Sequence, residues 1–195
     1  MNGRILRLLQ LNSGDTIQSA EAYADYLIEE FKKQPNAESQ NGWQIENEIT
    51  LEYSGNQLIS IRQSSFENLG GAHPNIRINL RSYSTLSGER VSLKDVFLDN
   101  YEDSLLQLCN FHLRNALSSS LEIDYADMND AFKAQSFKLS ESFALNETGI
   151  VFIHLDPIIQ NNGTGFIEFT IPYSELIDAN LIDEKGVLGF LLGSV

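Results

Sequence analysis

The sequence is poor in cysteine and in basic residues. Cys109 is the only cysteine, so no intrachain disulfide can form. Lysine and arginine together number 13, against 27 aspartates and glutamates, which gives a formal net charge of -14. This charge repels phosphate backbones and anionic membrane surfaces, and it therefore argues against nucleic-acid binding. A cationic partner would be attracted instead.

Long apolar runs are also missing. None reaches the roughly 18 to 20 residues that a membrane-spanning helix needs, and the opening MNGRILRLLQLN is too short and too interrupted for a signal peptide. The chain has 195 residues, 42% of them apolar. That is enough to bury the core of one large domain, or of two small domains that share a core.

The N-terminal part of the chain predicts one helix and three strands. Apolar residues spaced by threes and fours over residues 16–33 predict an amphipathic helix. Its expected inner face is formed by Ile17, Ala20, Tyr23, Ala24, Leu27, Ile28 and Phe31. Two antiparallel strands are expected over residues 43–54 and 57–66 around a Ser-Gly-Asn turn, followed by a half-buried strand in which Ile76, Ile78 and Leu80 point inward.

The second part of the chain alternates helices and strands without a regular βαβ repeat. Ser92 is expected to cap a short helix, with Asp95 three residues on, and a longer helix is expected over residues 101–117. The inner face of that longer helix is predicted to hold Leu105, Leu108, Cys109, His112 and Leu113. The acidic residues 122–137 are expected to be loosely helical. A hairpin turning at 146–149, a strand over 165–176 and a terminal strand over 186–195 complete the pattern. This order predicts an α+β fold with antiparallel sheets packed against helices and two intertwined subdomains.

A Gly-Gly-Ala-His-Pro block joins the two parts. We interpret it as a structural joint, formed by Gly70, Gly71, Ala72, His73 and Pro74. The glycines permit a sharp change of direction, and Pro74 holds His73 extended. We therefore expect His73 to be structural, hydrogen-bonding a neighbouring loop, rather than catalytic.

Candidate catalytic and metal-binding residues are few. Cys109 and His112 share one helical face, as in a thiol enzyme or half of a metal site, but their leucine neighbours favour buried packing. His154 lies in a strand with no motif partner, so we expect it to be packed or hydrogen-bonded. We predict no catalytic residue, no metal site and no cofactor.

Two further patterns are open to a binding interpretation. Asp124, Asp127 and Asp130 repeat every third residue, but a calcium loop needs acids at alternate positions around a central glycine. A solvated helical face is the preferred interpretation, with weak cation binding as the alternative. The sequons at Asn146 and Asn162 are interpreted as turns.

Four segments of the chain together resemble a known pair of domains. They are LEYSGNQLISIRQSSFENLGGAHPN, TLSGERVSLKDVFLDNYEDSLLQL, ALNETGIVFIHLDP and GFIEFTIPYSEL. This order is similar to the paired extracytoplasmic domains of unknown function in the RsiV type of lysozyme-sensing anti-sigma factor and in the non-catalytic part of the PdaC type of peptidoglycan deacetylase. The chain departs from these relatives after Asp156-Pro157, where they carry an aromatic residue and an acid.

The resemblance implies a boundary between residues 1–68, a helix and hairpin like the first domain, and residues 69–195, like the second. It also implies a bacterial extracytoplasmic binding module, related to lipoproteins, whose leader has been removed from this sequence. Its partner would be a cationic protein such as lysozyme, or a cell-wall component. The alternatives are an accessory or remnant domain of a peptidoglycan-modifying enzyme and a structural envelope subunit.

Overall fold

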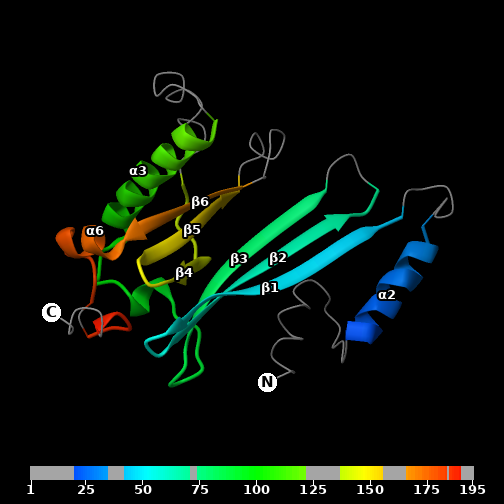
Figure 1. Ribbon diagram of the computed structural model, residues 1–195, viewed down its shortest axis with the longest axis horizontal. Coiled ribbons are helices and arrows are strands. Elements are labelled where there is room, and N and C mark those ends of the chain that lie inside the picture. The colour runs from blue at the N-terminus through cyan, green and yellow to red at the C-terminus, as the bar shows by residue number, and fades with distance from the viewer. Residues whose placement is uncertain are drawn as a thin grey trace. The chain divides into compact units, whose positions relative to one another are not determined.

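The computed structural model describes residues 20–34, 42–70, 74–121, 137–155, 166–183 and 185–189 (Figure 1). The chain forms two compact units, each assembled from separate stretches of sequence. The first unit comprises Met1–Ile49 and Gln63–Arg77, and the second comprises Thr50–Arg62 and Ile78–Val195. The domain boundary expected at residue 68 stays a prediction.

Helix α2 (Ala20–Lys32) belongs to the first unit and confirms the predicted amphipathic helix. Phe31 packs edge-on against Trp43, with ring centroids 5.5 Å apart. Only part of the predicted inner face is covered, because Tyr23, Leu27 and Phe31 are half-buried while Ile28 is 51% exposed. The helical period identifies the apolar face of a helix, but it does not determine how many residues of that face are covered by the rest of the protein.

Three strands form one sheet in the order β1-β2-β3. They are β1 (Gln44–Gly55), β2 (Leu58–Asn68) and β3 (Asn75–Ser84). Asn56 and Gln57 connect β1 to β2 with φ angles of 48° and 64°, the conformation of a two-residue hairpin loop. In β3, Ile78 and Leu80 are buried, as the alternating pattern predicted, while Ile76 is only half-buried; Ser82 is also buried.

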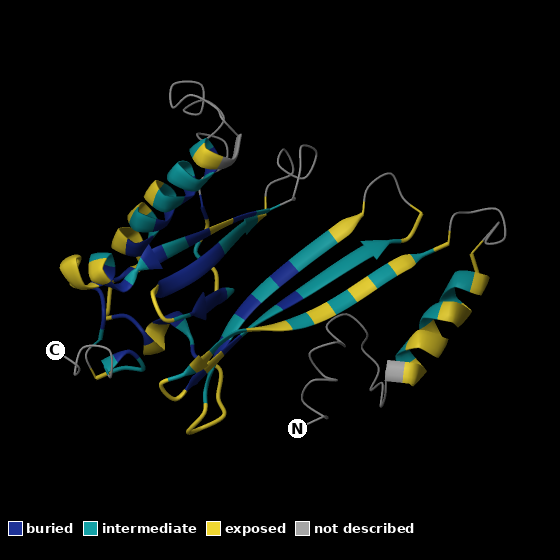
Figure 2. Cartoon of the chain, viewed as in Figure 1, coloured by how far each residue is buried: buried dark blue, intermediate teal, exposed yellow. Residues whose placement is uncertain are grey.

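The main core lies in the second unit, between a second antiparallel sheet and helix α3 (Glu102–Leu121). This sheet has the order β4-β5-β6, with β4 (Phe143–Leu145), β5 (Gly149–Leu155) and β6 (Phe166–Pro172). Leu105, Cys109 and Leu113 of α3 are fully buried in the core between α3 and this sheet. Figure 2 shows that β4 and β5 are largely buried. The rings of Phe137 and Phe169 pack edge-on, with centroids 5.2 Å apart.

Two segments depart from the predicted strands. The strand expected over residues 165–176 ends at Pro172, and helix α6 (Tyr173–Asp178) follows it. Proline has no N–H to continue the ladder, which explains the change at this residue. Residues 186–189 form turns rather than the expected strand, because the Gly186 N–H bonds back to the Asp183 carbonyl at 3.0 Å. The rest of that expected strand lies outside the described residues.

The two antiparallel sheets and their packed helices confirm the predicted α+β fold class. The described helices include none that is both long and apolar enough to cross a membrane.

Candidate functional site

The Gly-Gly-Ala-His-Pro joint is described only at its two ends. Gly70 has a φ of 82°, a conformation that favours glycine, and its N–H donates to Oδ1 of Asn68 at 3.2 Å. Pro74 is exposed just before β3. Gly71, Ala72 and His73 lie outside the described residues, so the structural role of His73 stays a prediction.

Cys109 and His112 share helix α3 but do not form a pair. The Cys109 side chain is fully buried, and this burial raises the pKa of its thiol to about 12. At neutral pH the thiol is therefore protonated and a poor nucleophile. His112 bonds elsewhere, since its Nε2 lies 2.7 Å from Oε2 of Glu175 in α6. The geometry agrees with the packing interpretation of Cys109.

The remaining candidates divide between packing, turns and segments that are not described. His154 is half-buried, and its ring lies 6.3 Å from that of Phe137, centroid to centroid. Asn146 forms the expected turn, because its Oδ1 accepts from the Thr148 N–H at 2.8 Å and from the Gly149 N–H at 2.9 Å. The triplet Asp124, Asp127 and Asp130, the sequon at Asn162 and the loop after Asp156 lie outside the described residues.

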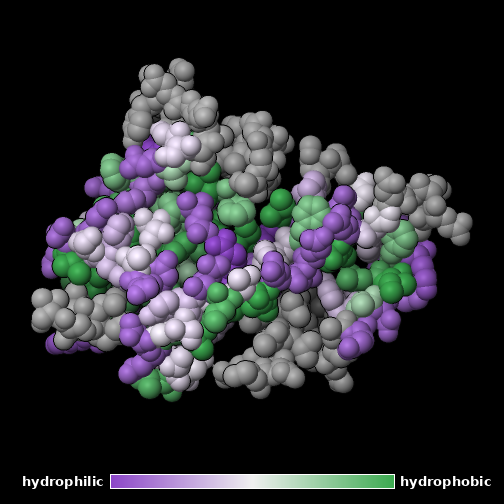
Figure 3. Space-filling view, in the orientation of Figure 1, coloured by the Kyte–Doolittle hydropathy of each residue, from purple (hydrophilic) through white to green (hydrophobic). Residues whose placement is uncertain are grey.

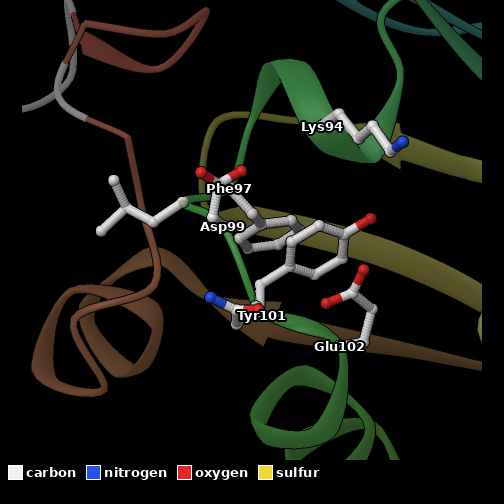
Figure 4. Close-up of a pocket in the computed structure, with 7 residues that line it drawn as sticks. Lys94, Phe97, Asp99, Tyr101 and Glu102 are labelled. Carbon is white, nitrogen blue, oxygen red and sulfur yellow. The ribbon is translucent and has the colours of Figure 1, made fainter.

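A pocket that the sequence did not predict lies where the short helix η2 (Leu93–Asp95) leads into α3. Its volume is about 380 Å³, and its lining is formed by Lys94, Phe97, Leu98, Asp99, Asn100, Tyr101 and Glu102. The rings of Phe97 and Tyr101 stack with centroids 5.0 Å apart. Lys94 and Glu102 lie on the Tyr101 side of this stack, and Asp99 lies on the Phe97 side (Figure 4).

The loop that lines the pocket, within residues 94–102, is held by local hydrogen bonds and by bonds to residues distant in the sequence. The Ser92 N–H donates to Oδ2 of Asp95 at 2.8 Å, the reciprocal capping bond that the sequence indicated. The Leu98 N–H donates to the Leu181 carbonyl at 2.9 Å, and the Val187 N–H donates to the Asp95 carbonyl at 3.1 Å. Sequence reasoning found the Ser92 and Asp95 signal but not the pocket, because Leu181 and Val187 reach the pocket loop only through the tertiary fold.

The chemistry of the pocket is mixed but predominantly polar. Burial raises the pKa of the Tyr101 hydroxyl, and the carboxylates of Glu102 and Glu141 add to this effect. The hydroxyl is therefore a neutral donor at physiological pH. Two carboxylates, an amide and a hydroxyl around buried rings provide hydrogen-bond acceptors and donors suited to a cationic or polyhydroxylated group. In the part of the chain that is described, no three histidine, cysteine or acidic side chains gather as metal ligands would.

Comparisons with known proteins agree with this fold. Residues 94–174 match the family described as "Protein of unknown function (DUF3298)". A DUF3298 family protein from Pseudomonas aeruginosa PAO1 has a similar solved structure, with a TM-score of 0.70, 19% sequence identity and coverage of 93% of this chain and 76% of that chain. A member of the same family from Bacteroides fragilis NCTC 9343 gives a TM-score of 0.67, 18% identity and coverage of 90% and 73%.

No curated protein matches the chain. At identities below 20%, the two solved structures establish the fold alone. Residues 94–174 therefore match the DUF3298 family of unknown function, and the chain has the fold of two solved proteins of that family.

Proposed function

We propose that the protein is a non-catalytic, extracytoplasmic binding module whose partner is a cationic protein, such as lysozyme, or a cell-wall component. The observation that carries this proposal is the net charge of -14. Surface charge of one sign attracts partners of the opposite sign and increases their rate of association. The resemblance to the RsiV and PdaC types supports a location outside the cytoplasm.

The pairing of the basic residues strengthens this argument. Lys32 and Lys33 pair with glutamates of α2, and Arg77 pairs with Glu67. Arg62 is bound by two carboxylates, those of Glu52 and Glu168. Such pairs leave much of the acidic excess uncompensated, and exposed acids include Glu46, Glu48, Asp99, Glu102, Asp103, Glu147 and Asp178.

The pocket beside Tyr101 supplies a place where a cationic side chain could bind. Asp99 and Glu102 are exposed acids at its rim, against the single amine of Lys94. A guanidinium or ammonium group there would gain charge-assisted hydrogen bonds. Asp99→Asn/Glu102→Gln should weaken such a contact while keeping the shape of the pocket.

Calorimetric titration with hen-type lysozyme tests the proposal directly. We expect binding at low salt whose affinity falls as the salt concentration rises, because ions screen the attraction between exposed charges. A purified acidic protein of similar size is the control and should give no heat. If titration with lysozyme at low salt produces no heat of binding, lysozyme is excluded as the partner. Absence of binding to purified peptidoglycan as well would overturn the proposed function.

The location and the lack of catalysis need separate tests. Fractionation of a native host should place the protein outside the cytoplasmic membrane, and recovery from the cytoplasm would contradict that part of the proposal. Incubation with peptidoglycan should release neither acetate nor soluble fragments. Release of either product would favour a peptidoglycan-modifying enzyme.

A further inference from the structure

Strand β1 forms one edge of its three-stranded sheet, because the strand order is β1-β2-β3. For residues 44–49, no backbone hydrogen bond to a segment other than β2 occurs among the described residues. In an edge strand, alternate residues direct their N–H and C=O groups away from the sheet. This edge therefore presents a row of backbone donors and acceptors that an added strand can pair with.

The side chains along this edge alternate between two environments. Gln44, Glu46 and Glu48 are exposed, while the residues between them are half-buried. The exposed face thus carries two carboxylates two residues apart. Gln44 donates from Nε2 to Oε1 of Glu46 at 2.8 Å, and no basic side chain pairs with Glu46 or Glu48 within the described ranges.

We propose that residues 44–49 bind an extended, lysine- or arginine-bearing segment of the cationic partner by adding it as a fourth strand beside β1. The backbone ladder would supply affinity. Cationic side chains on the exposed face of the added strand would lie opposite Glu46 and Glu48, within reach of a cross-strand ion pair. This inference rests on the proposed function and identifies the surface and the form of the partner.

Charge complementarity selects this occupant over a second copy of the chain. Pairing of two β1 edges would bring the glutamates of one copy close to those of the other, and like charges on facing strands are destabilising. The surface visible in Figure 3 also mixes hydrophilic and hydrophobic residues rather than presenting one broad apolar face. The edge is therefore suited to a basic extended segment.

The test uses the full chain and three synthetic heptapeptides. The first alternates lysine and valine, the second has proline at its central position, and the third has glutamate in place of lysine. We expect the alternating lysine peptide to bind in fluorescence-anisotropy titrations at low salt. The proline and glutamate peptides should bind at least about tenfold more weakly, since each loses either ladder hydrogen bonds or charge pairing.

Matched variants separate the edge from the overall charge. Glu46→Lys/Glu48→Lys should lower the affinity for the lysine peptide by about tenfold or more. The control Glu147→Lys/Asp178→Lys changes the net charge equally at exposed positions elsewhere and should change affinity by less than about twofold. Glu46→Gln/Glu48→Gln keeps the side-chain shape and should give a loss between these two. Circular dichroism and thermal melts establish that all three variants fold.

Equal losses in the two reversal variants would show attraction by overall charge and would overturn the edge proposal, while leaving the proposed function intact. Equal binding of the proline and lysine peptides would exclude strand addition. Failure of every peptide to bind would also overturn the edge proposal. The lysozyme and peptidoglycan titrations decide the proposed function independently of these results.

Discussion

The imidazole of His112 lies 2.7 Å from the carboxylate of Glu175, and this contact joins α3 to α6. The His112 side chain is 16% exposed and that of Glu175 is 39% exposed. Both groups are therefore partly shielded from water, and each supplies the other with a hydrogen-bond partner. This arrangement makes His112 a link between two helices rather than a partner of Cys109.

Removal of this link should destabilise the protein moderately. We expect His112→Ala to lower the free energy of unfolding by about 1–2 kcal/mol, since it deletes one hydrogen bond to a carboxylate. His112→Gln keeps a donor and should cost less. Urea denaturation measures both variants, and an unchanged midpoint for His112→Ala would show that the contact contributes nothing.

The buried thiol of Cys109 should make stability depend on pH in alkaline solution. Its pKa rises from 9.0 to about 12 in the folded chain, because burial disfavours the thiolate. Above pH 9 the unfolded chain loses this proton while the folded chain keeps it. The contribution of the buried thiol to the free energy of unfolding is therefore fully present below pH 9, and it is lost as the pH rises towards about 12.

The variant Cys109→Ala isolates this effect from the tyrosines, whose pKa values also rise on folding. The free energy of unfolding should fall more steeply between about pH 8 and about pH 10.5 in the wild type than in Cys109→Ala. Parallel pH profiles for the two proteins would contradict this account. Slow reaction of the native thiol with an alkylating reagent, compared with the urea-unfolded chain, is the accompanying readout.

Neighbouring residues of β3 should differ sharply in their tolerance of charge. Leu80 is fully buried against Ala144 and Val151, whereas Arg81 points to the other face of the strand and is half-buried. Leu80→Asp should cost more than about 4 kcal/mol because it buries an unpaired carboxylate, and Arg81→Asp should cost less than about 1 kcal/mol. Equal shifts in thermal melts would contradict this assignment of faces.

Arg62 should contribute more to stability than the exposed lysines do. Its side chain is 18% exposed, and it binds Glu52 through Nε and Glu168 through Nη2, each at 2.5 Å. Arg62→Gln leaves two carboxylates without their shared cation and should cost about 2 kcal/mol. Lys32→Gln removes the exposed pair with Glu29 and should cost less than about 0.5 kcal/mol. Denaturant titrations that gave equal costs would assign Arg62 no special role.

Two glycines offer a matched test of backbone packing. Gly149 pairs with Pro172, and a Cβ added there would collide with the backbone carbonyl of Ile171. Gly149→Ala should therefore cost at least about 3 kcal/mol. A Cβ at Gly42 would meet nothing within 4 Å, so Gly42→Ala should change the unfolding free energy by less than about 1 kcal/mol. A Gly149→Ala protein as stable as the wild type would refute the close approach of β5 and β6.

Local sequence patterns were sufficient to predict most of the helices and strands. The helical period placed Leu105, Cys109 and Leu113 in the core, and strand alternation did the same for Ile78 and Leu80. Pro172 carries a local signal that the strand prediction had not used, because proline ends the ladder where α6 begins. These features depend on the backbone period and on the hydrogen-bonding capacity of single residues.

For α3 and β3, periodicity alone determined which side turns inward, because burial of apolar surface follows the repeat of the backbone. The tertiary structure decided which residues meet, since contact requires the chain to bring distant segments together. The bond between His112 and Glu175 spans 63 positions, and that between Arg62 and Glu168 spans 106. The loop that lines the pocket beside Tyr101 is likewise held by distant residues, since the Leu98 N–H bonds to the Leu181 carbonyl and the Val187 N–H bonds to the Asp95 carbonyl.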